Sequence, residues 1–93
     1  MPLTIARIRN LVRSLDYVVA RHAAEELDDE NLTILDLESI ILTGRIIERQ
    51  RDRQTREVKC LVRGLTVGSQ EAETVVKVGP TGKLFIITVY LIK

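Results

Sequence analysis

The sequence has little sulfur, few aromatic rings and a single imidazole. It contains one cysteine, Cys60, so an internal disulfide is impossible and a thiolate zinc site would need other chains. Aromatic residues make up only 3% of the chain, which leaves no row of rings for stacking single-stranded bases. One histidine and one cysteine do not supply a tetrahedral metal site. We therefore expect no metal, no cofactor and no base-stacking platform.

Long apolar runs and a secretory leader are also missing. Arg7, Arg9 and Arg13 interrupt the apolar residues near the N-terminus, and no run reaches the roughly 18 residues of a membrane span. No glycine-rich loop precedes a helix, which argues against the common nucleotide-hydrolysing motifs. These absences predict a cytoplasmic protein with no membrane partner.

What is present is the composition of an ordinary globular protein, with 45% hydrophobic and 29% charged residues. Its length predicts a single domain over residues 1–93. The formal net charge is +1, but the charges are unevenly placed. Residues 25–38 hold seven acids and no lysine or arginine, whereas residues 45–63 hold seven bases and three acids. We expect an acidic helical half and a basic strand half.

Apolar residues at spacings of three and four predict a helix over residues 3–15, with Thr4 as its N-cap. Residues 16–19 are expected to form a turn or a short extended piece, and a second helix over residues 20–27 follows. Thr33 and Asp36 form a capping pair for a third helix, and Gly44 is placed for a left-handed C-terminal cap.

Alternating polarity after residue 44 predicts strands at 45–49, 58–65, 74–78 and 84–92, with a charged hairpin loop at 50–55. The last strand is almost wholly apolar, so we expect it to be central and covered on both faces, or shared with a second subunit. Its residues predicted to face the helices are Phe85, Ile87, Val89 and Leu91. The predicted fold class is α+β, with two or three N-terminal helices packed on one face of a three- to four-stranded antiparallel sheet.

Five features in order give the chain a family resemblance. After an N-terminal helix come Tyr17-x-x-x-x-His22-Ala23, Gly44-x-Ile46-Ile47-Glu48, Cys60-Leu61-Val62-x-Gly64 and Ile86-Ile87-Thr88-Val89-Tyr90. Together they resemble the bacterial domain-of-unknown-function family four-two-five-eight. The resemblance implies, by analogy, an RNA-cleaving toxin fold of the RelE and barnase kind, with substrate on the sheet face opposite the helices. It assigns functional positions to His22, Glu48, Thr88 and Tyr90.

Two positions depart from the family pattern. The family commonly has an arginine eight residues after the histidine, where this chain has Glu30, and a serine before the His-Ala step, where it has Ala20. Reversing a charge beside a phosphate site would weaken anion binding, which counts against an enzymatic function.

His22 is the natural residue for proton transfer at a ribose 2′-hydroxyl or a leaving 5′-oxygen, because its pKa lies near neutrality. The structural alternative is a bond to backbone, or a pair with Glu25 or Glu26 one turn on. Arg45 and Arg63 are candidates to clamp the scissile phosphate, with Glu48 as base. Their alternative is a solvated face of cross-strand ion pairs, each worth under about 1 kcal/mol.

Tyr90 and Thr88 share a face of the last strand, so their hydroxyls are candidates for phosphate binding, and Tyr90 equally suits the edge of a dimer core. The run from Arg49 to Arg56 either steers a polyanion or is an ordinary hairpin tip.

Two functions from different classes follow. The first is a toxin-like, metal-independent endoribonuclease or RNA-binding domain, with RNA and a cognate antitoxin-like protein as partners. The second is a non-catalytic protein-interaction module, expected to be a homodimer, whose apolar last strand and acidic helix face dock a partner.

Overall fold

Helices fill the first half of the chain and strands fill the second, apart from one short early strand. The computed structural model describes residues 3–93. In chain order the elements are α1 (Ile5–Arg13), β1 (Tyr17–Val19), α2 (Arg21–Asp29), α3 (Ile34–Thr43), β2 (Arg45–Arg51), β3 (Val58–Leu65), β4 (Glu71–Val78) and β5 (Leu84–Leu91). The predicted α+β class is confirmed.

The sheet has five strands in the order β1-β5-β4-β3-β2, and it is mixed rather than antiparallel. β1 pairs with β5 in parallel, whereas the other neighbours are antiparallel. The predicted three- to four-stranded antiparallel sheet is therefore wrong, because three extended residues before α2 add an edge strand. β4, not β5, is the middle strand.

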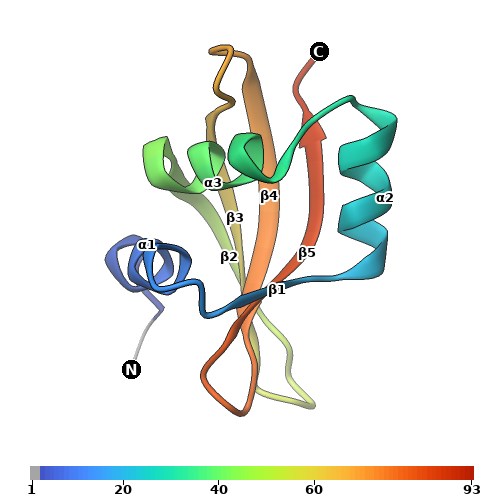
Figure 1. The fold of residues 1–93 in the computed structure, drawn as a ribbon. Coiled ribbons are helices and arrows are strands. Elements are labelled where there is room, and N and C mark those ends of the chain that lie inside the picture. The colour runs from blue at the N-terminus through green and yellow to red at the C-terminus, as the bar shows by residue number, and fades with distance from the viewer. Residues whose placement is uncertain (1–2) are drawn as a thin grey trace.

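The helices lie on one face of the sheet, with α2 running alongside β5 (Figure 1). We call the helix-covered side the inner face and the other side the open face. In β3, Cys60 and Val62 are fully buried on the inner face, whereas Lys59, Leu61 and Arg63 alternate with them on the open face. The core between the layers includes Leu37, Ile40 and Ile41 of α3 and Val76, Leu84, Ile86 and Val89 of the sheet.

The ends of the helices follow the side-chain chemistry of the sequence. Thr4 caps α1 by accepting a hydrogen bond from the Arg7 N–H, as predicted. Thr33 and Asp36 form the predicted reciprocal capping box of α3. The left-handed cap predicted at Gly44 is wrong, because Gly44 is extended with φ −87°. A Cβ there would collide with the carbonyl oxygen of Ile40, so close approach explains this glycine.

β5 does not alternate as the sequence suggested. Val75 pairs with Thr88 and Val76 with Ile86, so Ile87 forms a bulge without a partner of its own. Leu84 and Ile86 are consequently buried on the inner face before the bulge, and Val89 is buried there after it. The predicted inward set was wrong for Phe85 and right for Val89, because an extra residue switches every later side chain to the other face.

Three strand limits also differ from those predicted, and the smallest difference is that β5 ends at Leu91 rather than at residue 92. β2 extends to Arg51, and the turn after it is held by the Asp52 carboxylate, which accepts bonds from the N–H groups of Gln54 and Thr55. β4 begins at Glu71 rather than at residue 74. Within residues 3–93, none of the helices combines the length and apolar character needed to cross a membrane.

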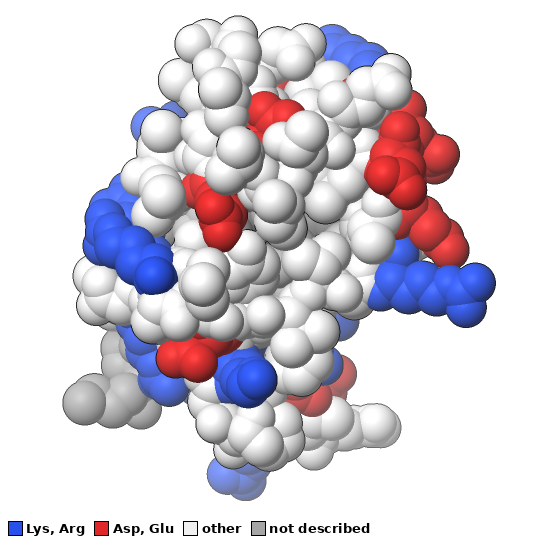
Figure 2. All heavy atoms as spheres, in the orientation of Figure 1, with Lys and Arg blue, Asp and Glu red and all other residues white. Residues whose placement is uncertain are grey.

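The charge on the helical face is uneven, as Figure 2 shows. Acidic side chains gather over α2, whose residues include Glu25, Asp28 and Asp29. The surface over α3 is largely uncharged, and exposed aliphatic residues such as Leu35 contribute to it.

Candidate functional site on the open sheet face

Two rows of cross-strand neighbours bring most of the predicted site residues together on the open face. The register aligns Arg45 with Arg63, Arg63 with Glu73, and Glu73 with Tyr90. The next row contains Glu48, Leu61, Val75 and Thr88. Five of the six predicted residues therefore lie in adjacent rows of one face: Arg45, Glu48, Arg63, Thr88 and Tyr90.

Arg63, Glu73 and Tyr90 form a connected polar group at the centre of this face. Arg63 Nη2 lies 2.7 Å and Arg63 Nε 2.9 Å from Glu73 Oε2. The Tyr90 hydroxyl donates a hydrogen bond of 2.6 Å to the other carboxylate oxygen, Glu73 Oε1. Glu73 is only 7% exposed, and both of its oxygens are bound. Much of the charge of Arg63 is thus already balanced within the chain.

The contacts of Glu73 fix the protonation of this group at neutral pH. The hydrogen bond from Tyr90, followed by that from Arg63, lowers the pKa of Glu73 below its usual value. The same bond to Glu73, with burial, raises the pKa of Tyr90 to about 12. Tyr90 therefore keeps its proton and acts as a hydrogen-bond donor, not as a base.

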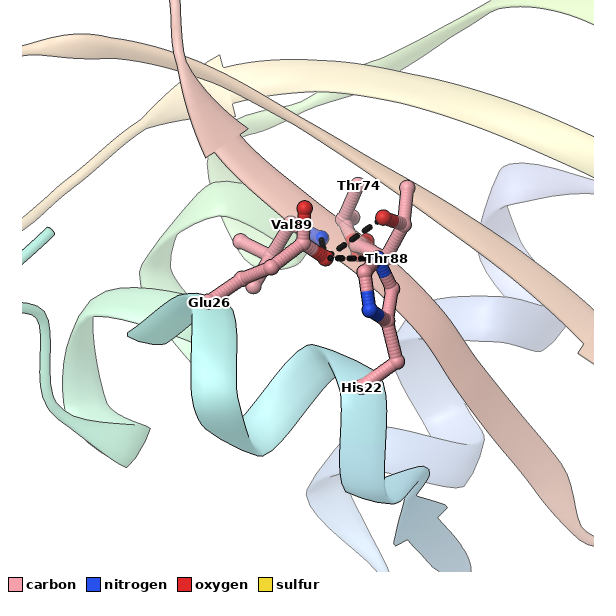
Figure 3. A network of polar contacts seen from close by, with 5 residues as sticks. All are labelled: His22, Glu26, Thr74, Thr88 and Val89. Carbon is pink, nitrogen blue, oxygen red and sulfur yellow. Dashed lines mark hydrogen bonds and ion pairs between the residues drawn. The ribbon is translucent and has the colours of Figure 1, made fainter. Parts of the chain in front are cut away.

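His22 lies on α2, beside the β5 side of the sheet, and Glu26 links it to the open-face residue Thr88. Its Nε2 is 3.4 Å from Glu26 Oε1, one helical turn away, and the ring is 68% exposed. Figure 3 shows both side chains reaching from α2 toward β5, with the second ring nitrogen of His22 making none of the marked contacts. Of the alternatives left by the sequence, the pair with Glu26 is therefore formed, while the ring stays accessible to solvent.

Glu26 links this imidazole to the sheet. The same Oε1 accepts bonds from the backbone N–H of Val89, at 3.0 Å, and from the hydroxyl of Thr88. β1 ends at Val19, so β5 has no strand partner at this height, and the carboxylate satisfies a strand amide that would otherwise be unpaired. Glu26 thus holds α2, and His22 with it, against the row that contains Thr88.

The register also separates residues that the sequence grouped together. Glu48 and Thr88 occupy the same row but lie on β2 and β5, three strand spacings or about 14 Å apart. His22 lies beyond Thr88. Glu48 and His22 are therefore too far apart to act on one phosphodiester, and Arg45 is separated from His22 in the same way.

Two hollows lie near β2 and β3. One of about 470 Å³ is lined by Thr43, Arg45, Arg63, Gly64, Leu65 and Glu71. A smaller one of about 120 Å³ lies between Glu48 and Tyr90, with Gln50, Lys59, Leu61 and Val75 around it. Arg45 forms no ion pair with the acids of the described chain, so it is the free cation of the larger hollow.

Sequence reasoning missed the role of two carboxylates. The sequence named Glu26 only as one of two possible partners of His22, from their helical spacing, and did not predict its bonds to β5. Glu73 was detectable as the acid opposite Arg63 once the turn around Gly68 had fixed the hairpin register. Within residues 3–93, no group of three or more histidine, cysteine or carboxylate residues is arranged to hold a metal ion.

The comparison with protein families assigns the chain to a family. Residues 19–91 match the model of the family described as Domain of unknown function (DUF4258), which is the family whose motifs the sequence resembles. The match covers most of the chain, and the protein belongs to this family. Searches of curated proteins and of solved structures found no match to it.

The two residues that depart from the family pattern, Ala20 and Glu30, lie at the two ends of α2. Ala20 is the N-cap of α2 and makes no side-chain cap bond, so a serine in its place would cap the helix. Glu30 is the C-cap of α2, and its carboxylate pairs with Lys93 Nζ at 3.3 Å. Neither residue belongs to the group of His22, Glu26 and Thr88.

Proposed function

We propose that this protein binds single-stranded RNA across the open face of its sheet and cleaves it without a metal ion, with His22 as proton shuttle. The observation that carries the proposal is an exposed imidazole, paired with Glu26 beside Thr88, at the β5 side of a face that also carries Tyr90, Arg63 and Arg45. The family resemblance to toxin folds of the RelE and barnase kind supports the choice of RNA.

The width of the face suits a strand rather than a single phosphate. The distance between the β5 and β2 sides, about 14 Å, exceeds the spacing of neighbouring phosphates in one strand. In this proposal His22 acts at one phosphodiester, while Arg45 and Arg63 hold a phosphate at least one nucleotide further along. Glu48 then contacts the bound strand near Tyr90 rather than the scissile bond.

The chemistry at His22 is transesterification. The imidazole accepts the proton of the ribose 2′-hydroxyl, the 2′-oxygen bonds to phosphorus, and the P–O5′ bond breaks. The imidazolium then gives the same proton to the leaving 5′-oxygen, so the products are a 2′,3′-cyclic phosphate and a 5′-hydroxyl. Glu26 stabilises the transient cation, and the Thr88 hydroxyl lies beside it.

Cleavage of a mixed-sequence RNA in the presence of a chelator tests the proposal. We expect wild type to form cyclic phosphate ends and His22→Ala to lose about 100-fold or more in rate. Arg21→Ala is the matched control, because Arg21 lies next to His22 on α2 and its side chain is 94% exposed. Equal cleavage by wild type and His22→Ala, or no cleavage by either, would remove His22 from catalysis.

RNA binding is tested separately through Arg45. We expect Arg45→Ala to weaken binding of a short RNA uniformly across sequences and to reduce the slope of log affinity against log salt by about one. An unchanged salt slope would show that Arg45 contacts no phosphate.

A second candidate function is a non-catalytic interaction module, with a cognate antitoxin-like protein or a second copy as partner. The observation that favours it is the bond between Arg63 and Glu73, which uses a cation that a nuclease would direct at phosphate. Sedimentation at micromolar concentration tests the homodimer, and a clean monomer would count against it.

A further inference from the structure

β2 is the last strand of the sheet, and its outer edge is unpaired in the described structure. Of its seven residues, six are exposed and only Ile46 is partly buried. Among residues 3–93, no backbone group outside β3 hydrogen-bonds to the backbone of β2. An edge of this kind can accept another strand.

The register shows which backbone groups face outward. The Asp52 N–H donates to the Glu57 carbonyl, so this pair is hydrogen-bonded. Pairs alternate between bonded and non-bonded along an antiparallel ladder. Arg51 and Val58 are therefore non-bonded, as are Arg49 and Cys60 two positions further along. The N–H and C=O groups of Arg49 and Arg51 consequently point away from β3.

The side chains of β2 decide which kind of strand can pair there. The strand carries Arg45, Arg49 and Arg51 against a single acid, Glu48. Two copies paired antiparallel about Glu48 would place Arg45 opposite Arg51 and Glu48 opposite its own copy. Like charges placed directly opposite each other destabilise a strand pair. The edge thus repels a second copy and attracts an acidic strand.

A hollow of about 210 Å³ adjoins this edge, lined by Leu3, Val58, Arg49 and Arg51. Leu3 is buried and fixed in place, because its carbonyl accepts bonds from the Arg49 guanidinium at 3.2 and 3.4 Å. A lining of two aliphatic side chains and two arginines suits an aliphatic residue flanked by carboxylates.

We propose that the β2 edge is a docking site for an extended, acidic segment of a partner protein, which adds to the sheet as a sixth strand and places an aliphatic side chain in the hollow beside Leu3. The backbone edge supplies the hydrogen bonds, the arginines select for acid, and the hollow sets the register. This site lies on β2, whereas Thr88 and Tyr90 lie on β5 and His22 on α2, so it does not depend on the proposed function.

The test uses a labelled octapeptide of alternating valine and glutamate, with fluorescence anisotropy for affinity and amide hydrogen exchange for location. We expect binding to slow exchange at Arg49 and Arg51. A peptide with lysine in place of glutamate, and one N-methylated at alternate residues, should each bind about tenfold more weakly or worse. Equal binding of the lysine peptide, or protection only at other strands, would overturn the proposal.

Charge reversal supplies the matched variants. Arg51→Glu should weaken the acidic peptide by about tenfold, whereas Arg13→Glu, the same charge change at an exposed position of α1, should have less than about a twofold effect. RNA cleavage, if present, should persist in Arg51→Glu, which separates this site from the nuclease proposal. Protection of the β2 amides by a single-stranded RNA but not by the peptide would show that the strip is a nucleic-acid surface and reject the docking site.

Discussion

Replacing Gly64 by alanine tests how the helical layer sits on the sheet. A Cβ at Gly64 would collide with the carbonyl oxygen of Ile40 and lie 2.8 Å from the carbonyl carbon of that residue and 3.0 Å from Gly44 Cα. All three atoms belong to the backbone, so no side chain can rotate to make room. α3 must therefore move away from β3 by roughly an ångström.

The cost follows from the core that α3 carries. Leu37, Ile40 and Ile41 are at most 1% exposed, and burial of each stabilises the fold by about 2 kcal/mol. A gap approaching one ångström forfeits a quarter to a half of the contact energy. We therefore expect Gly64→Ala to lower the free energy of unfolding by about 2 to 3 kcal/mol, equivalent to about 10–20 °C in Tm.

Equilibrium urea unfolding and thermal melting provide the measurement, with Gly68→Ala as control. A Cβ at Gly68 would have Thr66 Oγ1 at 4.0 Å as its nearest neighbour, so that substitution should change stability by less than about 1 kcal/mol. Equal stabilities of the two variants would refute the close packing of α3 on β3.

Two further predictions concern hydrogen-bonded groups. Burial, followed by the hydrogen bond to Glu38, raises the pKa of Tyr17 to about 12, and the pKa of Tyr90 is also raised to about 12. The stability that these two protonated hydroxyls contribute is therefore complete below pH 10 and is lost as the pH rises toward 12. We expect the free energy of unfolding to fall by about 3 kcal/mol per tyrosine between pH 10 and pH 12. Tyr90→Phe should remove the contribution of Tyr90 to this pH dependence. A phenolate absorbance at pH 10 equal to that of free tyrosine would contradict the prediction. At the helix ends, Ala20→Ser should stabilise the protein by about 1 kcal/mol in urea unfolding, because it adds an N-cap to α2, and Thr33→Ala should destabilise it by about 1 kcal/mol, because it removes the N-cap of α3. Unchanged unfolding midpoints would show that neither cap contributes to stability.

The elements that sequence predicted well are those governed by local interactions. The capping box of Thr33 and Asp36 satisfies helix amides within one turn, so the residues themselves specify where α3 begins. In β3, side chains point alternately to opposite faces as in any strand, so Cys60 and Val62 lie inward while Arg63 lies outward. These features would be expected in any fold that buries the same residues.

Features that depend on distant partners were not available to the sequence. The bulge at Ile87 exists only because β4 and β5 pair around it, and it reverses the inward side of half of β5. The extended conformation near β1 was among the expectations for residues 16–19, but its parallel pairing with β5 depends on a partner far along the chain. Gly44 is explained by contact with the backbone of α3 rather than by a helix cap.

The same division applies to the site. The sequence alone determined which polar groups are available, namely one histidine and the arginines, acids and hydroxyls of the strands. The alternation of side chains along each strand determined which strand residues share a face. Tertiary structure decided that Glu26 bridges His22 to β5, that Glu73 binds Arg63 and Tyr90, and that Glu48 lies the width of three strands from Thr88. The physical reason is that strand order and helix docking set distances between residues far apart in the chain, whereas periodicity sets only the direction in which each side chain points.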